Sequence, residues 1–536
     1  MKEIKKKIEE NLKKAVKEIT KKDVEVVVFP ASKKEFGDFT TNISFKLSGE
    51  NPSVISEKIK EKISHLISDI VEKIEVKGGY INFFISKNVY FNFLKELVEK
   101  KESALKSDTG KGEKILIEFV SANPTGPLTI AHGRQASFGE ALSRIMKFAS
   151  FSVVKEFYIN DGGRQIELLG KSLKARYYQL KGEKYQIPED GYYGEYLVEL
   201  AKKIKEENLD DEFFKKFAYE KILDGIKKDL NDFGVTFDNW VRESNFLKDG
   251  KVEKIINELK EKKLIYFKDG SWWFKSTSFG DDKDRVVIKS DGSYTYLATD
   301  IAYHKYKIER GFETLINIVG PDHHGYIPRM KAAVEAIGFN PEKLKFLIVQ
   351  LTTLYRGKEK ISMSTRKGQF ISLRELMDEV GPDASKFFFL FRKAESHLDF
   401  DIELAKKKST ENPVFYLQYG YVRMKHILHF AESKNIEIDK IKFEPEYLKE
   451  EEEILLLKKM WKFPEIIENV VKTYGVHLLC EYLLDLAKTF HSYYQKHRVV
   501  GEDKKLTETR LFLIKGLYIV FSLSLNLLNI SLPEKM

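Results

Sequence analysis

The stretch IEFVSANPTGPLTIAHGRQASFGEALSRI, residues 117–145, decides the predicted fold. Residues before Ser121 are mostly apolar and β-branched, as in a buried strand, whereas apolar residues from Gln135 onward recur at helical spacing. The loop between them brings His132 to the start of the helix, where backbone N–H groups and the helix dipole favour an anion such as a nucleotide phosphate. Taken alone, the segment fits a loop with one stray histidine equally well.

Strands and helices alternate from residue 114 to about residue 400. The strand-like runs are KILIEFV, FSVVKEFYIND, ETLINIVG and LKFLIVQL, and each adjoins a helical stretch. This order predicts a Rossmann-like, doubly wound parallel sheet, whose ligands bind beyond the carboxyl ends of the strands. A helical insertion is predicted within this domain, from about residue 163 to residue 230.

Two further domains flank the predicted sheet. Residues 1–105 combine an amphipathic helix, with apolar residues repeating from Ile4 to Ile19, with the strand-like runs VEVVVFP and EVKGGYINFFIS, and they predict a small α+β domain. Residues 403–536 have helical periodicity almost throughout and predict an all-α bundle. The fold class is therefore predicted to be multidomain α/β.

Composition excludes several classes of protein. The chain has 536 residues, is 42% hydrophobic and 32% charged, and carries a net charge of +9, which favours a polyanionic partner without requiring one. The N-terminus lacks the apolar block of a signal peptide, and no uninterrupted apolar run is long enough to span a membrane. The single cysteine, Cys480, lies in an apolar helical stretch and is interpreted as part of the core. We expect a cytoplasmic protein that does not bind membranes.

A second candidate for chemistry is the basic loop LYRGKEKISMSTRKGQFISLREL, residues 354–376. A mobile, glycine-bearing loop of this kind can neutralise a triphosphate as its charge redistributes during displacement. By itself the loop is better explained as a solvated charged surface. The combination with His132 favours the phosphate-binding interpretation.

Two other segments carry polar side chains at strand or helix ends. In YTYLATDIAYH, Tyr296 and Asp300 lie one helical turn apart, and a carboxylate with a neighbouring phenol suits a cationic ligand. In NIVGPDHHGYIPRM, a strand leads into Asp322, His323 and His324. This cluster could bind a metal, but adjacent histidines usually point apart, so the wall of a polar pocket is the favoured interpretation.

These segments together resemble the arginyl-tRNA synthetases, a class I aminoacyl-tRNA synthetase family, over essentially the whole chain. FPASKKEFGDFTTN is similar to the family's N-terminal additional domain, SANPTGPL and AHGR to its first signature, and NPVFYLQYGYVR to the opening of its helical anticodon-binding domain. EFYINDGGRQIELLG, YLATDIAYH, VGPDHHGYIPR and DEVGPDASKFFFL are similar to stretches peculiar to this branch. The resemblance implies that Mg-ATP activates arginine to arginyl-adenylate and that arginine is transferred to the 3′ end of tRNA(Arg), with tRNA required even for the first step.

The resemblance also implies roles for individual residues of this sequence. ATP would be bound by residues of the two signatures and of the DHH segment: Thr129, Ala131, His132, Gly133, Asp322, His324, Ser362, Met363, Ser364 and Thr365. Arginine would be bound by Ser121, Asn123, Tyr296 and Asp300. tRNA would contact Phe36 in the N-terminal domain and Tyr416, Gln418, Tyr419 and Arg498 in the bundle, although these aromatic residues could equally belong to the core. We expect a monomer, and no metal bound by the protein itself.

Both signatures depart from the family pattern. The His-Ile-Gly-His box reads Thr129-Ile130-Ala131-His132, and the Lys-Met-Ser-Lys loop reads Ser362-Met363-Ser364-Thr365, so both lysines are absent. We expect Arg366 and Lys367, which adjoin the vacant position, to supply the missing charge and to act in catalysis together with His132. The alternative is a synthetase-like, tRNA-binding or regulatory protein with a decayed activation site. The intact Asn123, Tyr296 and Asp300 favour an enzyme that still selects arginine.

Overall fold

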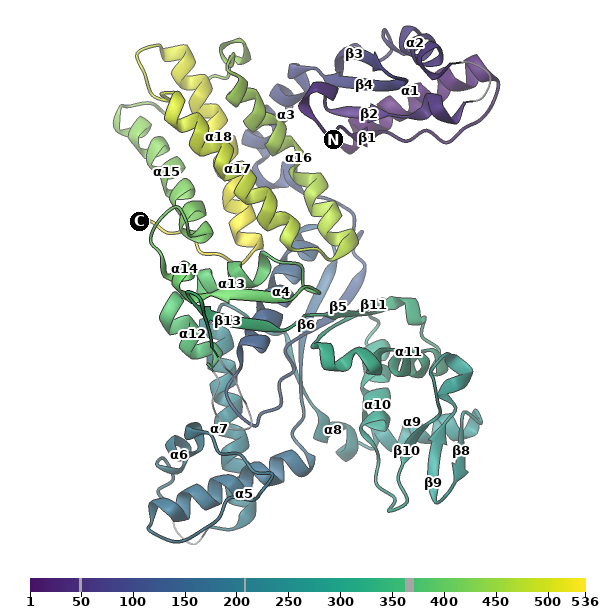
Figure 1. The fold of residues 1–536 in the computed structure, drawn as a ribbon, viewed down its shortest axis with the longest axis vertical. Helices are drawn as coiled ribbons and strands as arrows, with labels where there is room; N and C mark the ends of the chain where they lie inside the picture. The colour runs from purple at the N-terminus through teal and green to yellow at the C-terminus, as the bar shows by residue number, and fades with distance from the viewer. Residues whose placement is uncertain (48–50, 207–208, 362–370) are drawn as a thin grey trace.

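The computed structural model describes residues 1–47, 51–206, 209–361 and 371–536, and its central feature is a five-stranded, fully parallel sheet (Figure 1). The strand order is β12-β11-β5-β6-β7. From β5 the chain builds one half of the sheet through β6 and β7 and later the other half through β11 and β12. The predicted doubly wound fold is confirmed, and its switch point lies between β5 and β11. The strands span Lys114–Glu118 (β5), Ser152–Ile159 (β6), Asn239–Arg242 (β7), Thr314–Val319 (β11) and Leu344–Ile348 (β12).

Helices cover both faces of this sheet, which explains why its strands read as continuous apolar runs. Along β5, Ile115 and Ile117 belong to the larger core, which includes α4, whereas Leu116 belongs to a second core with α9, α10 and α11. Successive residues therefore pack into opposite layers, as the twofold period of a strand requires. The helices span Ile130–Phe148 (α4), Glu243–Lys248 (α8), Lys251–Glu261 (α9), Tyr296–Glu309 (α10) and Ile327–Ala336 (α11).

The predicted insertion is helical, but two small sheets around the parallel-sheet domain were not predicted. The insertion consists of α5 (Gly163–Leu180), α6 (Glu195–Ala201) and α7 (Asp211–Asp232). One small sheet is antiparallel, with β8 (Ile265–Lys268), β9 (Ser271–Phe274) and β10 (Arg285–Ile288). The other contains β13 (Thr352–Arg356), β14 (Glu359–Lys360) and β15 (Leu398–Asp401). Strands of two to five residues are too short for a periodic signal in the sequence.

The N-terminal domain is an antiparallel sheet of order β1-β2-β4-β3 with α1 (Lys2–Thr20) and α2 (Pro52–Ile63). The strand predicted for VEVVVFP is wrong for most of its length, because only β1 (Phe29–Pro30) is paired. Just before β1, the Val28 N–H donates to the Glu9 carboxylate, and the Val27 carbonyl accepts a hydrogen bond from the Thr41 hydroxyl. These side chains take the place of a strand partner. EVKGGYINFFIS forms a hairpin, β3 (Val71–Lys77) and β4 (Tyr80–Ile85), and β2 spans Phe39–Thr41.

The C-terminal bundle consists of four long helices, α15 (Pro413–Ser433), α16 (Glu451–Thr473), α17 (His477–Lys496) and α18 (Lys504–Leu527). Helix α3 (Lys87–Lys100), which lies within the range predicted for the N-terminal domain, packs against α16 and α18 (Figure 1). The contact is close, since a Cβ atom at Gly516 would lie 2.3 Å from Leu94 Cδ1. Among the described residues, α18 alone is long and apolar enough to cross a membrane, but 67% of its apolar window is buried, as in a core helix.

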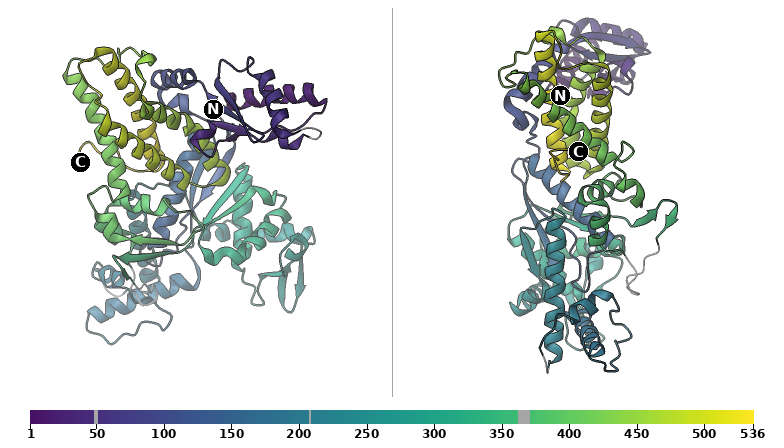
Figure 2. Two further views of the ribbon diagram at one scale, coloured as in Figure 1. Left: turned by 45° about the horizontal axis from the view of Figure 1, so that its top comes forward. Right: turned by 90° about the vertical axis from the view of Figure 1, so that its left-hand side faces the viewer.

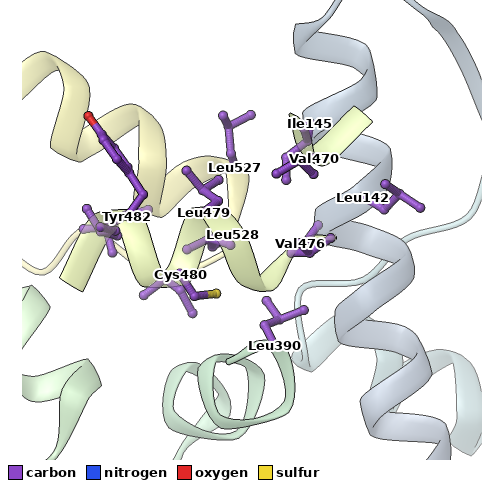
Figure 3. Close-up of a cluster of buried hydrophobic side chains, with 14 of the residues drawn as sticks. Leu142, Ile145, Leu390, Val470, Val476, Leu479, Cys480, Tyr482, Leu527 and Leu528 are labelled. Atoms are coloured by element: carbon purple, nitrogen blue, oxygen red, sulfur yellow. The ribbon is translucent and has the colours of Figure 1, made fainter. Parts of the chain in front are cut away.

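The bundle and the parallel-sheet domain share a core. Figure 3 shows Leu142 and Ile145 of α4 next to Val470, Val476 and Leu479. Cys480 is a buried free thiol in this cluster, which confirms the interpretation of this residue as core. The N-terminal domain and the bundle lie at one end of the elongated molecule and the insertion at the other (Figure 2). The connection between the domains contains α12 (Leu373–Val380), α13 (Pro382–Leu390) and α14 (Ile402–Lys406).

Candidate active site

A cavity of about 630 Å³ opens at the carboxyl ends of β5 and β11, where the strand order reverses. Its wall comes from β5 and the following loop, the start of α4, one side of α10 and the short helix Pro321–Tyr326. This is the position at which doubly wound sheets bind ligands. The predicted site residues that line it are Ser121, Asn123, Ala131, His132, Tyr296, Asp300 and Asp322.

The chain leaves β5 through a strained turn. Val120 has φ +67° and Ser121 has φ +38°, and the Ser121 N–H donates to the Phe119 carbonyl at 2.9 Å, the pattern of a γ-turn with positive φ. The Ser121 hydroxyl donates to Glu118 Oε1 at 2.9 Å and accepts from the Tyr158 N–H at 3.1 Å. Val120 is β-branched, and such residues rarely adopt a positive φ. Backbone strain of this kind concentrates at functional sites. Here the turn directs the loop across the edge of the sheet and over the cavity.

His132 lies in the first turn of α4 and is neutral. Its Nδ1 accepts the backbone N–H of Thr129, the N-cap residue, at 3.1 Å. Burial lowers the pKa of His132 to about 4, and the nearby carboxylate of Asp322 opposes this shift only in part. A neutral imidazole that accepts at Nδ1 carries its proton on Nε2. His132 therefore offers the cavity an N–H donor but no positive charge at neutral pH.

Three residues predicted to bind ATP lie outside the described wall of the cavity. Gly133 is buried under α12, and a Cβ atom there would lie 2.6 Å from Leu373 Cδ1. Thr129 forms an isolated bridge with Ser372 and caps α4. His324 is also absent from the wall, whereas its neighbour His323 is present. Gly133 and Thr129 thus have structural roles in this fold, in packing and capping.

The opposite part of the cavity is acidic. Burial raises the pKa of Asp300 to about 6, although a hydrogen bond from the Tyr326 hydroxyl favours the charged form. Burial and the charges of Asp300 and Asp161 raise the pKa of Glu243 to about 7. The sequence analysis missed Tyr326 and Glu243. The position of Glu243, directly after the parallel strand β7, is the signal that could have identified it.

A buried, charge-balanced network lies beneath Asp300. Burial alone would raise the pKa of Glu118, but the Lys307 ammonium, which donates to it, holds that pKa below its usual range. His304 Nδ1 donates to the Asp300 carbonyl at 2.8 Å, and the Asn317 amide donates to His304 Nε2 at 3.2 Å. Burial, assisted by Lys307, lowers the pKa of His304 to about 3, so this histidine is neutral. Lys307 is thus already paired with Glu118.

The described residues that line the cavity include no lysine or arginine. Asp300 and Glu243 therefore face it without a protein cation on the wall to balance them. A buried carboxylate without a partner is costly, so this surface is suited to a ligand that brings its own positive charge.

The helical insertion holds the loop that carries Asn123. The Asn123 amide donates to Gln165 Oε1 on α5 at 2.9 Å. The Tyr196 hydroxyl on α6 donates to the Thr125 carbonyl at 2.6 Å. The insertion thus positions one rim of the cavity. Tyr296 begins α10 near the start of α5, since a Cβ atom at Gly163 would lie 3.7 Å from the Tyr296 hydroxyl. It is 64% exposed, so its phenol is available to a ligand.

The second signature lies outside the described residues. Ser362, Met363, Ser364, Thr365, Arg366 and Lys367 all fall between β14 and α12, in the range 362–370. Their predicted contacts with ATP remain predictions.

The described residues contain one cluster with metal-ligand spacing, and it lies away from this cavity. It comprises Glu450, Glu452 and His497 in the bundle, where Glu452 is paired with Lys496. In the DHH segment, His323 Nδ1 lies 3.2 Å from Asp322 Oδ1, while His324 does not reach the described wall.

The residues predicted to contact tRNA in the bundle are only partly brought together. Tyr419 and Arg498 line a second cavity, of about 790 Å³, together with Arg423. The Tyr416 ring lies beside it, packed on His491 with the ring centres 4.3 Å apart. Gln418 instead donates to Asp383 at 2.9 Å and joins the bundle to α13. In the N-terminal domain, Phe36 is half-buried, with Lys77 Nζ 5.1 Å from its ring centre.

Comparisons with known proteins cover nearly the whole chain. Three family models match: the arginyl tRNA synthetase N terminal domain at residues 2–85, the catalytic domain of the class I (R) tRNA synthetases at residues 93–395, and the DALR anticodon binding domain at residues 417–536.

Relatives of known function agree with these models. The arginine–tRNA ligase of Syntrophotalea carbinolica is 43% identical over 519 residues, which cover 94% of this chain and 93% of that protein. That of Anoxybacillus flavithermus is 42% identical over an alignment of 556 residues, covering 100% of this chain and 99% of that protein. The arginyl-tRNA synthetase structure from Thermus thermophilus, 21% identical, has the same fold, with a TM-score of 0.78 over 99% of this chain and 100% of that one. The chain therefore belongs to the arginyl-tRNA synthetases, a family of class I aminoacyl-tRNA ligases.

Proposed function

We propose that this arginine–tRNA ligase activates arginine in the cavity at the carboxyl ends of β5 and β11, with the guanidinium beside Asp300 and the carboxylate toward His132. The observation that carries the proposal is the acidic wall. Asp300 and Glu243 are buried carboxyl groups with raised pKa values, and the described lining includes no lysine or arginine. A guanidinium fits because it is planar, permanently charged and able to donate to several oxygens.

The reaction is the one that membership of the arginine–tRNA ligase family implies. A carboxylate oxygen of arginine attacks the α-phosphorus of Mg-ATP, a new P–O bond forms, and pyrophosphate leaves with its bonding electrons. A terminal ribose hydroxyl of tRNA then attacks the activated carbonyl and displaces AMP. Magnesium enters with the nucleotide as part of the substrate.

The residues at the phosphate end act by electrostatics and hydrogen bonding. His132 provides a neutral N–H donor at the N-terminus of α4, where the helix dipole also favours phosphate. Positive charge for the pyrophosphate is assigned from the sequence to Arg366 and Lys367. Such groups lower the barrier when their contact strengthens as charge develops.

The tRNA is assigned to two surfaces. The cavity of Tyr419, Arg423 and Arg498 combines aromatic faces with guanidinium groups, which suits unstacked anticodon bases. The N-terminal domain, with Phe36, is assigned a second contact with tRNA. The enzyme is assigned to the cytoplasm as a monomer.

Arginine-dependent exchange of pyrophosphate into ATP, measured with and without tRNA(Arg), tests this function. An active ligase gives exchange with arginine that requires or is strongly stimulated by tRNA. A tRNA-binding protein with a decayed activation site gives none under either condition, while it still binds tRNA in a filter assay.

A further inference from the structure

Tyr326 is the side chain that holds the arginine-facing carboxylate in place. It ends the short helix Pro321–Tyr326 that follows β11, and its hydroxyl donates to Asp300 Oδ2 on α10. The ring lines the cavity and is covered by the guanidinium of Arg329, 5.1 Å from the ring centre. Tyr326 is thus fixed by packing, unlike Tyr296, which is 64% exposed.

The hydrogen bond from Tyr326 engages only one of the two oxygens of the Asp300 carboxylate. An ionised carboxylate accepts through two oxygens, and the protein hydrogen bond to Tyr326 occupies Oδ2. Oδ1 accepts no hydrogen bond from the described residues and is left for a ligand. Resting on the function proposed above, we infer that Tyr326 is a positioning residue for arginine: its hydroxyl keeps Asp300 ionised and orients the free oxygen toward the guanidinium.

The other groups around Asp300 would not replace this hydrogen bond. Burial and the charge of Glu118 oppose ionisation of Asp300, whereas the charges of Lys307 and His323 favour it only through space. Glu243 on α8 adds a further carboxyl on the far side. His304 contacts only the backbone carbonyl of Asp300.

The buried Tyr158 hydroxyl also faces this group of acids, and it has no hydrogen-bond partner among the described residues. Tyr326 is therefore the side-chain donor that the described structure gives to the Asp300 carboxylate.

The test replaces Tyr326 by phenylalanine, which keeps the ring and removes only the hydroxyl. We expect the arginine KM in aminoacylation to rise roughly tenfold near neutral pH, as for loss of a hydrogen bond to a charged group, with ATP KM unchanged. Removing the donor raises the pKa of Asp300, so the acid limb of kcat/KM for arginine moves to higher pH. The difference between variant and parent should narrow at alkaline pH, where Asp300 is ionised in both. The matched control is Tyr306→Phe, which also removes one tyrosine hydroxyl. Tyr306 lies on α10, six residues after Asp300.

A double-mutant cycle with Asp300→Asn separates positioning from a merely structural role. If Tyr326 acts through Asp300, Tyr326→Phe has no further effect on arginine KM in the Asp300→Asn background. The inference is overturned if Tyr326→Phe leaves the arginine KM and the acid limb unchanged while Asp300→Asn weakens arginine binding. It is also overturned if the effects of the two substitutions on the arginine KM are additive. If Asp300→Asn itself has no effect on arginine, the proposed binding mode fails, and this outcome is distinct from the previous two. Thermal melting of both single variants shows whether they fold.

Discussion

Replacing Asp300 by asparagine should weaken arginine binding far more than ATP binding. The substitution keeps the size of the side chain and its hydrogen bond with Tyr326 but removes the charge opposite the guanidinium. In the free protein, a carboxyl pKa raised from 3.8 to about 6 means that ionising Asp300 costs about 3 kcal/mol more than in water. A bound guanidinium compensates this cost, and an amide cannot do so.

The magnitude follows from the burial of the pair. Removing one partner of a buried ion pair typically costs about 3–5 kcal/mol, or a hundredfold to a few thousandfold in affinity. Glu243 lies near Asp300, and the charge of Asp300 is one of the causes that raise the pKa of Glu243 to about 7. The substitution removes this charge, so Glu243 ionises more readily in the variant and can replace part of the lost charge. We therefore expect the lower end of this range, about a hundredfold, with a larger loss for the double change of Asp300→Asn and Glu243→Gln.

Steady-state aminoacylation at saturating tRNA gives the arginine and ATP KM values separately. Glu309→Gln is the matched control, because it removes the same charge from an exposed position on the same helix. Asp300→Ala should behave like Asp300→Asn, which excludes an effect of amide orientation. An unchanged arginine KM in both Asp300 variants would refute the assignment of the guanidinium to this wall.

Four further substitutions test other parts of the protein. Gly133→Ala should lower the thermal midpoint, since its Cβ would lie 2.6 Å from Leu373 Cδ1 and overpacking costs about 1–3 kcal/mol; an unchanged melting curve contradicts the packing role. Tyr419→Ala and Arg498→Ala should each weaken tRNA binding in a filter assay without altering arginine binding, and unaltered tRNA affinity in both would remove their cavity from the interface. Arg366→Ala should lower kcat with ATP KM nearly unchanged, as expected for a contact formed in the transition state; a parental rate contradicts it.

The parts of the fold that could be predicted are those encoded in one continuous segment. Residues 117–145 contain a strand, a loop and a helix in sequence, so local periodicity placed His132 at the start of α4 before any contact was known. Tyr296 and Asp300 were paired by helical spacing, and both line the cavity. In these cases, residues that are close along the chain are also close in space.

The parts that could not be predicted depend on contacts between distant segments. The phenol that bonds Asp300 belongs to Tyr326, 26 residues away, rather than to its helical neighbour Tyr296. Gly133 was predicted to bind ATP, but Leu373 packs against it, and only the fold reveals that these two residues are close. Likewise, VEVVVFP has strong β-propensity, yet side chains satisfy the backbone groups just before β1.

We expect the two altered signatures to differ in their effect on activity, because of the distribution of charge in the cavity. At the end of the cavity that we assign to phosphate, His132, the histidine that the first box retains, is buried and neutral, so this box offers donors and a helix dipole rather than formal charge. Thr129, in place of a histidine, caps α4 and lies outside the described wall of the cavity, so its hydroxyl serves the helix rather than the ligand. No lysine or arginine is present on the described wall, so protein charge for the departing pyrophosphate must come from elsewhere. The basic segment that holds Arg366 and Lys367 is the place in the sequence where such charge is concentrated beside the missing lysines. Activity in this chain should therefore be far more sensitive to charge in the second signature than to restoration of the first.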